Sequence, residues 1–185
     1  ILGNARRMQR LVDDLLDLSR IESGRWRPEV AAIDVAETAA EVWSDIAGRA
    51  EEAGVAVSTE IGEGAATLLA DPEGVRLVLR NLLDNAVRYT PRGGRIALRS
   101  TVAEEGIALQ VEDTGSGIPQ EHLSRVFERF YRVDPSRSRA EGGTGLGLAI
   151  VRQAAETHGG TVEVESAPGR GALFRVRLPG EERKP

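Results

Sequence analysis

The sequence predicts an α/β fold, a two-layer sandwich in which helices cover one face of a mixed, mainly antiparallel sheet. Two observations lead to this class. Segments with apolar residues at spacings of three and four, typical of amphipathic helices, are interleaved with short apolar segments that end in Gly and Pro turns. Because helices and hairpins are interleaved, the helices are expected to form one layer and the strands the other.

The composition sets limits on the function. The chain has 185 residues, 41% of them hydrophobic, which is enough for one domain with its own core. A net charge of −5 argues against nucleic-acid binding, which needs a basic surface. The absence of cysteine excludes a disulfide framework and a thiolate metal site. No apolar segment approaches the roughly 20 residues that span a bilayer, and no signal peptide is evident.

A single amphipathic helix is predicted first, over residues 4–22. Its apolar residues recur at helical spacing: Met8, Leu11, Val12, Leu15, Leu18 and Ile21. Because the pattern begins without a methionine or a cap, we expect a fragment of a longer protein. Such a helix is marginal alone. It either packs on its own domain or forms half of a helical hairpin in a dimeric bundle, and the break at residues 23–28 favours the hairpin.

Further helices are predicted over residues 34–53, 72–89, 119–129 and 144–158. Asp34 is a suitable N-cap, with Glu37 three residues later as in a capping box. Gly54 is a natural stop for that helix, and Pro72 suits the first position of the next. Gly159-Gly160 ends the last of them.

Strands are predicted from short apolar segments over residues 55–61, 67–70, 95–102, 107–112, 161–166 and 172–178. The turn at residues 91–94 leads into the first hairpin, and the turn at 168–171 joins the final pair of strands. Residues 131–143 are polar with weak periodicity, which indicates a mobile loop. The tail after Pro179 is expected to fray.

Two asparagines on the helix predicted over residues 72–89 suggest a metal and phosphate site. Asn81 and Asn85 are four residues apart and share a helix face, with Arg88 on the same side one turn later. Amide oxygens are hard, neutral ligands that suit Mg²⁺, which takes further ligands from phosphate. Asparagines are also common on exposed helix faces, so this motif alone leaves both interpretations open.

A glycine-rich segment follows a predicted strand: Asp113-Thr-Gly115-Ser-Gly117-Ile-Pro119. The carboxylate can accept a hydrogen bond from the exocyclic amine of a nucleobase, and the glycines let the backbone approach a flat base. Because Asp and Gly also form ordinary turns, the segment is a weak signal by itself.

A second glycine-rich segment, Gly143-x-Gly145-x-Gly147, opens a predicted helix. Backbone N–H groups at a helix N-terminus favour phosphate. The spacing is neither the dinucleotide-binding fingerprint nor a P-loop, and a simple capping loop is an equal alternative.

The loop between the two glycine-rich segments carries Arg132, Arg137 and Arg139. Any of these arginines can neutralise charge on a transferred phosphoryl group, although a solvated basic loop is the better explanation for any single one of them. Phe127 and Phe130 are expected to anchor the loop by packing.

Together and in this order, the motifs resemble the catalytic ATP-binding domain of bacterial sensor histidine kinases, over roughly residues 34–179. The similar segments are an asparagine box (81–90), a first glycine box (113–119), a phenylalanine box (127–132) and a second glycine box (143–148). Residues 169–174 are similar to the closing glycine segment, with Ala172 where Thr is frequent. Residues 4–22 resemble the second helix of the dimerisation hairpin.

The resemblance implies a Bergerat-type fold, with ATP and Mg²⁺ as ligands. It implies a division into part of a dimerisation hairpin (1–23), a linker (24–33), a catalytic domain (34–179) and a tail (180–185). The implied function is that of the phosphoryl donor in a two-component phosphorelay. The implied partners are an upstream histidine-bearing helix, a dimer mate and a response regulator receiver domain, without nucleic acid or direct membrane contact. The implied location is the cytoplasmic part of a membrane-bound sensor.

Residue roles also follow from the resemblance. It implies Asp113 on adenine, Asn81 and Asn85 near Mg²⁺ and the phosphates, and Arg88 and Tyr89 lining the nucleotide. Arg132 or Arg137 would contact the γ-phosphate from the loop between the two glycine boxes, which would act as a lid over the nucleotide. The remaining implied nucleotide-binding residues are Gly115, Gly117, Ile118, Gly143, Thr144, Gly145, Leu146, Gly147 and Leu148.

Two differences from the sequence patterns of this family and its relatives restrict the activity that we expect. The family's phosphoacceptor is a His followed by an acidic residue, whereas Leu123 follows His122 and Gly159 follows His158. We therefore expect the donor half alone, an ATP:protein-histidine kinase domain without its acceptor. Gyrase-type and MutL-type relatives use Glu at the position of Asn81 to activate water, and an amide lacks that basic oxygen. A hydrolytic ATPase or conformational clamp, and a non-catalytic module, remain as alternatives.

Overall fold

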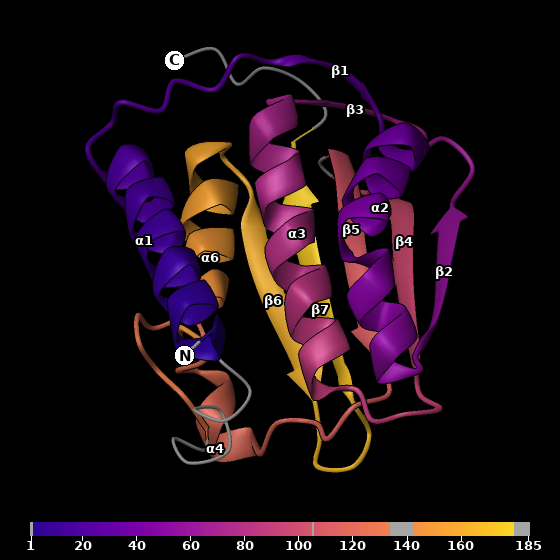
Figure 1. The fold of residues 1–185 in the computed structure, drawn as a ribbon. Helices are drawn as coiled ribbons and strands as arrows, with labels where there is room; N and C mark the ends of the chain where they lie inside the picture. The colour runs from indigo at the N-terminus through magenta and orange to yellow at the C-terminus, as the bar shows by residue number, and fades with distance from the viewer. Residues whose placement is uncertain (1, 105, 134–142, 180–185) are drawn as a thin grey trace.

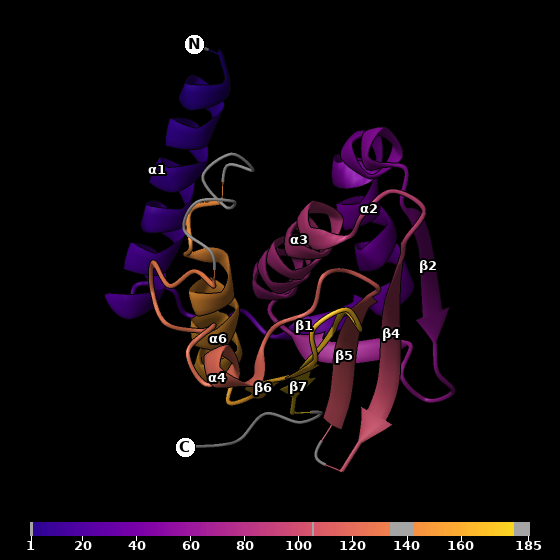
Figure 2. The same ribbon diagram turned by 90° about the horizontal axis from the view of Figure 1, so that it is seen from below.

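The computed structural model describes residues 2–104, 106–133 and 143–179. It confirms the predicted fold class: helices lie on one face of a mixed sheet (Figures 1 and 2). The five-stranded sheet has the order β2-β4-β5-β7-β6. Its strands are β2 (Ala56–Ile61), β4 (Arg95–Ala103), β5 (Gly106–Asp113), β7 (Ala172–Leu178) and β6 (Thr161–Ser166). β2 pairs with β4 in parallel, and every other pair is antiparallel.

The helical layer packs in the order α2, α3, α6 and α1 across the sheet (Figure 1). The helices are α1 (Leu2–Glu22), α2 (Val35–Ala53), α3 (Pro72–Tyr89), α4 (Gln120–Leu123) and α6 (Gly147–Thr157). No helix in the described ranges has both the length and the apolar character that crossing a bilayer requires.

Local end signals determine where α2 and α3 begin and end. The Asp34 side chain accepts a hydrogen bond from Glu37 N at 2.9 Å, and Gly54 adopts the left-handed conformation at the far end of α2. Asp71 caps α3 in the same way, through Gly74 N at 2.8 Å, ahead of Pro72. These helix bounds therefore match the predicted ones closely.

The core lies between α3 and the sheet. Leu79, Leu82 and Leu83 of α3 are fully buried, and so are Leu98 of β4 and Leu109 of β5. Burying such aliphatic side chains is worth about 1.5–3 kcal/mol each against leaving them in water. α3 is thus fixed at the centre of the helical layer, and its asparagines are fixed with it.

Two predicted helices were too long. Only residues 120–123 of the predicted helix 119–129 are α-helical, because turns with i→i+3 hydrogen bonds follow, from Arg125 N to His122 O and from Glu128 N to Arg125 O. The last helix begins at Gly147 instead of Thr144, because Gly145 adopts φ +77°.

One strand was not predicted. β1 (Ala31–Asp34) pairs antiparallel with β3 (Thr67–Ala70) in a separate two-stranded sheet. β1 is too short to show an alternating pattern in the sequence. It leads the chain from α1 into α2.

α1 lies beside α6, at the edge of the helical layer (Figures 1 and 2). Leu18 and Ile21 are buried against the domain, whereas Met8, Val12 and Leu16 are 68%, 47% and 59% exposed. The apolar stripe is therefore fully covered by the helix's own domain only near its C-terminal end.

Candidate nucleotide-binding site

Asp113 is the last residue of β5, on the face of the sheet that the helices cover. It is 7% exposed, and its neighbours across the sheet are Ile96 and Ala172. Its Oδ1 accepts a hydrogen bond from Gly115 N at 2.7 Å. Burial raises the pKa of this carboxyl group, and hydrogen bonds from the Gly115 and Ala172 N–H groups offset part of the rise. The Asp113 carboxyl group is therefore held in a buried position, where a hydrogen bond donated by a ligand is stronger than it would be in water.

The first glycine box interlocks with the closing glycine segment. Gly171 N donates to Gly115 O at 3.1 Å, and Gly169 N donates to Ser116 O at 2.7 Å. Ile118 N donates to Ser166 Oγ at 2.8 Å. The segment after β6 is thus part of the support for the loop that follows Asp113.

Close backbone contacts explain two of these glycines. At Gly117 (φ +70°) an added Cβ would overlap the carbonyl oxygen of Ala167. At Gly171 (φ +71°) it would overlap the carbonyl oxygen of Asp113. The absence of a side chain at Gly117 thus leaves room for the loop that contains Ala167.

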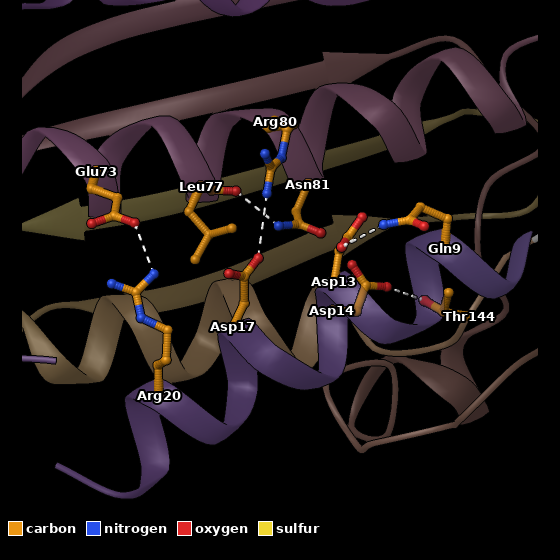
Figure 3. Close-up of polar contacts among 10 residues, drawn as sticks. All are labelled: Gln9, Asp13, Asp14, Asp17, Arg20, Glu73, Leu77, Arg80, Asn81 and Thr144. Carbon is orange, nitrogen blue, oxygen red and sulfur yellow. Dashed lines mark hydrogen bonds and ion pairs between the residues drawn. The ribbon is translucent and has the colours of Figure 1, made fainter. Parts of the chain in front are cut away.

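Asn81 lies where α3 approaches the start of α6 (Figure 3). Its Nδ2 donates to Leu77 O at 2.9 Å, which fixes the orientation of the amide. Its Oδ1 faces Gly147, where an added Cβ would lie only 2.8 Å away. The Asn81 oxygen is therefore directed at the first residue of α6.

Asn85 is half-buried one turn further along α3, and its side chain has no hydrogen-bond partner within the described ranges. Among the described residues, the amide oxygens of Asn81 and Asn85 both therefore remain without a hydrogen bond. This donor set fits Mg²⁺, which prefers hard oxygen ligands and completes its shell with water and phosphate.

Arg88 and Tyr89 occupy the last turn of α3. Arg88 Nη2 pairs with Asp84 Oδ2 at 3.1 Å, and Asp84 also pairs with Arg49 of α2. The Arg88 guanidinium is thus held within α3. Tyr89 is 41% exposed, and its backbone oxygen accepts from Ser116 N at 3.3 Å, which ties the asparagine box to the first glycine box.

The start of α6 has no side-chain cap, unlike the starts of α2 and α3. The N–H groups in the first turn of a helix have no intrahelical acceptor, and they carry the positive end of its dipole. An anion is their natural partner. Leu146 is fully buried in the core, so it can contribute to such a site only through its backbone.

The phenylalanine box is joined to the second glycine box by backbone contacts. Phe130, a non-glycine residue at φ +60°, donates from its N–H to Gly145 O at 2.8 Å. Arg132 donates to the carbonyl oxygen of Gly143. Phe127 packs edge-on against Phe174, which confirms its predicted anchoring role. Phe130 is 58% exposed, so its predicted packing role was wrong. Arg137 and Arg139 lie outside the described residues.

Two features near the site were missed from the sequence. The Thr90 hydroxyl is buried and has no hydrogen-bond partner within the described residues. Thr144 Oγ1 donates to Asp14 Oδ2 of α1 at 2.6 Å (Figure 3). No sequence signal pairs residues so far apart, and for Thr90 the only hint was its place at the end of the asparagine box.

Comparison with known proteins identifies the family. Residues 70–182 match the family described as histidine kinase-, DNA gyrase B-, and HSP90-like ATPase. The chain belongs to this family. Its fold, order of motifs and resemblance to histidine kinase catalytic domains agree with that membership. As a member of this ATPase family, it is an ATP-binding domain.

The relatives of this ATP-binding domain include a protein named as a sensor and a protein named as a histidine kinase. It is 38% identical over 174 residues to the sensor protein IrlS of Burkholderia pseudomallei. This alignment covers 94% of the chain and 37% of IrlS. The structure of the Acinetobacter baumannii histidine kinase AdeS matches with a TM-score of 0.80 and 25% identity, over 98% of this chain and 82% of that one. The structure of full-length ShkA in complex with AMPPNP matches with a TM-score of 0.81 and 30% identity. This match covers 93% of this chain and 35% of the ShkA chain. The chain thus spans well under half of IrlS.

Proposed function

We propose that this chain is the phosphoryl-donor domain of a two-component sensor histidine kinase. It binds ATP with Mg²⁺ and transfers the γ-phosphoryl group to a histidine imidazole that lies outside residues 1–185. One observation carries the proposal: the buried Asp113, the amides of Asn81 and Asn85 and the uncapped start of α6 border one another, because Ser116 N bonds to Tyr89 O and Asn81 Oδ1 faces Gly147. Similarity to the sensor protein IrlS and to the histidine kinase AdeS supports it.

Each part of the site has a proposed role. Asp113 accepts a hydrogen bond from the adenine amine, while Gly115, Gly117 and Ile118 shape the loop beside the base. Asn81 and Asn85 hold Mg²⁺, which neutralises phosphate charge. The backbone of residues 143–148 receives the phosphates at the start of α6. Arg88 and Tyr89 line the nucleotide, and Arg132 or Arg137 contacts the γ-phosphate.

Transfer to a histidine is favoured over hydrolysis because position 81 carries an amide. An Asn oxygen does not accept a proton at neutral pH, so it cannot activate water as a carboxylate does. Kinase catalysis consists mainly of positioning and electrostatic stabilisation, and the acceptor can therefore arrive from another domain.

The arrangement also supports proposals about the whole protein. We propose that residues 1–23 complete a dimerisation hairpin, that 24–33 link it to the catalytic domain at 34–179, and that 180–185 form a tail. The exposed Met8, Val12 and Leu16 leave an apolar face on α1 for an upstream histidine-bearing helix and a dimer mate. The proposed phosphate recipient is a receiver domain, and the proposed location is the cytoplasmic part of a membrane sensor.

Phosphoryl transfer in trans tests the function. The chain is incubated with Mg²⁺ and γ-labelled ATP, alone and with a histidine-bearing hairpin domain. Acid-labile label on the hairpin is expected, with little turnover when the hairpin is left out. Rapid ATP hydrolysis without an acceptor would favour the hydrolytic alternative, and a lack of Mg·ATP binding in calorimetry would favour a non-catalytic module.

A further inference from the structure

Acidic side chains on α1 face α3 and the start of α6. Figure 3 shows Asp13, Asp14 and Asp17 on this side of the helix. Asp14 Oδ2 accepts from Thr144 Oγ1 at 2.6 Å, and Asp17 Oδ2 pairs with Arg80 Nη2 at 3.4 Å. Asp13 is exposed and, among the residues that the structure describes, accepts a hydrogen bond only from its own helix, from Gln9 Nε2 at 3.2 Å. Asp14 is therefore the carboxylate that contacts the second glycine box.

The Asp14 carboxylate lies at the end of the site that suits an anion. Thr144 precedes the uncapped start of α6, and its Oγ1 also accepts from Leu146 N at 3.2 Å. The neighbouring Gly147 faces the oxygen of Asn81. A carboxylate and a phosphate satisfy the same kind of donors at a helix N-terminus. In this arrangement Asp14 accepts the hydrogen bond of the Thr144 hydroxyl, which could otherwise be donated to a phosphate oxygen.

A second anion is poorly tolerated beside Asp14. The group is largely withdrawn from water, and burial raises its pKa even though the Thr144 hydrogen bond opposes the rise. The pKa of Asp17 is raised by burial as well. Like charges in such a poorly solvated position repel more strongly than at the surface. A triphosphate that enters the same end of the site therefore meets both a competitor for Thr144 and a repulsive charge.

The ion pairs between α1 and the rest of the domain are of a kind that can be broken without unfolding the domain. The ion pairs Arg80–Asp17, Arg20–Glu73 and Arg129–Glu22 join side chains that are at least partly exposed, and such pairs are weak and screened by salt. A surface hollow of about 450 Å³ remains between α1 and the phenylalanine box, lined in part by Leu15, Leu18 and Phe130. Packing of α1 on the domain is therefore incomplete.

We propose that the acidic face of α1 is a built-in competitor for the phosphates of ATP. When α1 is docked, Asp14 holds Thr144 and lowers the affinity for Mg·ATP. When nucleotide is loaded, the phosphates displace Asp14 and α1 leaves the start of α6. Nucleotide occupancy and helix position are thereby coupled, and each shifts the other reciprocally. The inference rests on the proposed function in taking this site to be the one that binds ATP.

Calorimetry with Mg·AMPPNP on the whole chain tests the competition. Asp14→Asn keeps the shape of the side chain but removes its charge, and about fivefold to tenfold tighter binding is expected, which is the usual size of such a coupling. Asp13→Asn is the matched control, because it removes one charge from the same helix without touching Thr144, and its affinity is expected within about twofold of the original. Equal affinities for the original chain and Asp14→Asn would overturn the proposal.

A distance measurement tests the displacement directly, in a protein that keeps Asp14. Because the chain contains no cysteine, Met8→Cys on α1 and Ala47→Cys on α2 can carry spin labels at exposed positions. Saturating Mg·AMPPNP is expected to lengthen or broaden the distance distribution. An unchanged distribution at saturation would overturn the displacement while leaving ATP binding intact. If neither the original chain nor Asp14→Asn binds nucleotide, the proposed function fails, and this inference fails with it.

Discussion

At the scale of single residues, the site depends on polar groups whose surroundings differ sharply. Asp113 is buried on the helix side of the sheet, and burial raises its pKa. Asp71 is also buried, but hydrogen bonds from Glu29 N and Gly74 N outweigh its burial and lower its pKa. Both carboxylates accept hydrogen bonds from backbone N–H groups, but only at Asp71 do hydrogen bonds outweigh the effect of burial on the pKa.

Asp113→Ala is expected to weaken ATP binding by at least about tenfold, because the adenine amine loses a buried charged acceptor. Calorimetry with Mg·ATP gives the affinity, and thermal unfolding shows whether the variant is folded. Glu112→Ala is the matched control, since its side chain is on the opposite, exposed face of the same strand. A folded Asp113→Ala protein with unchanged affinity would remove Asp113 from the adenine site.

Asn85→Ala is expected to remove the Mg²⁺ dependence of triphosphate binding, because an amide oxygen is lost from the metal's shell. The measurement is ATP affinity with and without Mg²⁺. Asn85→Asp is informative beside it, since a carboxylate can still bind the metal. If the Ala variant keeps its original Mg²⁺ dependence, Asn85 is not a ligand.

The lowered pKa of Asp71 predicts a pH-dependent contribution to stability. A carboxyl group whose pKa is lower in the folded state stabilises the fold above its unfolded pKa, near 3.9, and this contribution is lost as the pH falls through the folded value. Asp71→Ala is expected to cost about 1–2 kcal/mol at pH 7, through loss of the α3 cap. The difference from the original chain should shrink below about pH 4. Urea unfolding at several pH values measures it, and a constant difference down to pH 3 would contradict the assignment.

At the scale of elements, the loops of the site support one another through their backbones. The closing glycine segment bonds to the first glycine box, and the phenylalanine box bonds to the second. The close approach at Gly171 leaves no room for a side chain. A change in one loop is therefore expected to disturb its partner, although the two are far apart in the sequence.

Gly171→Ala and Gly169→Ala separate close packing from backbone strain. Both residues have positive φ, but an added Cβ overlaps Asp113 O at Gly171 and meets nothing within 4 Å at Gly169. Gly169→Ala is expected to cost about 1–2 kcal/mol, from left-handed strain alone. Gly171→Ala should cost about 1–3 kcal/mol more, from overpacking, and should also weaken ATP binding. Chemical denaturation and calorimetry measure both effects, and equal costs would argue against the observed contact.

At the scale of the whole molecule, one buried helix supports both the core and the site. α3 contributes Leu82 and Leu83 to the core and carries Asn81 and Asn85 at its border. The same helix packs against α2 on one side and α6 on the other. The two asparagines are therefore held in place by the interior of the domain.

Leu82→Ala is expected to destabilise the domain by about 2–5 kcal/mol, because it leaves a cavity in a fully buried position. Leu69→Ala is the control, since Leu69 is 41% exposed on β3, and a change within about 1 kcal/mol is expected there. Denaturant unfolding gives both values. Similar losses for the two variants would contradict the position of the core beneath α3.

Most elements were predictable because their signals are local. Asp34 and Gly54 mark the ends of α2, and the strands over residues 161–166 and 172–178 were predicted at their observed bounds. The helix predicted over residues 119–129 failed because tertiary contacts, such as the His122–Tyr131 hydrogen bond at 2.6 Å, stabilise turns there. β1 was missed because a four-residue strand is specified by its partner and not by its own pattern.

By itself, the sequence determined the class of fold, the order of the glycine and asparagine boxes and the helix face shared by Asn81 and Asn85, because periodicity, caps and turn residues act over a few positions. Only the tertiary structure decided that Gly171 lies against Asp113, that Arg132 contacts Gly143 and that Asp14 bonds to Thr144 across 130 positions of the chain. Such contacts form only when the sheet and the helical layer bring distant segments together, and no local propensity encodes them.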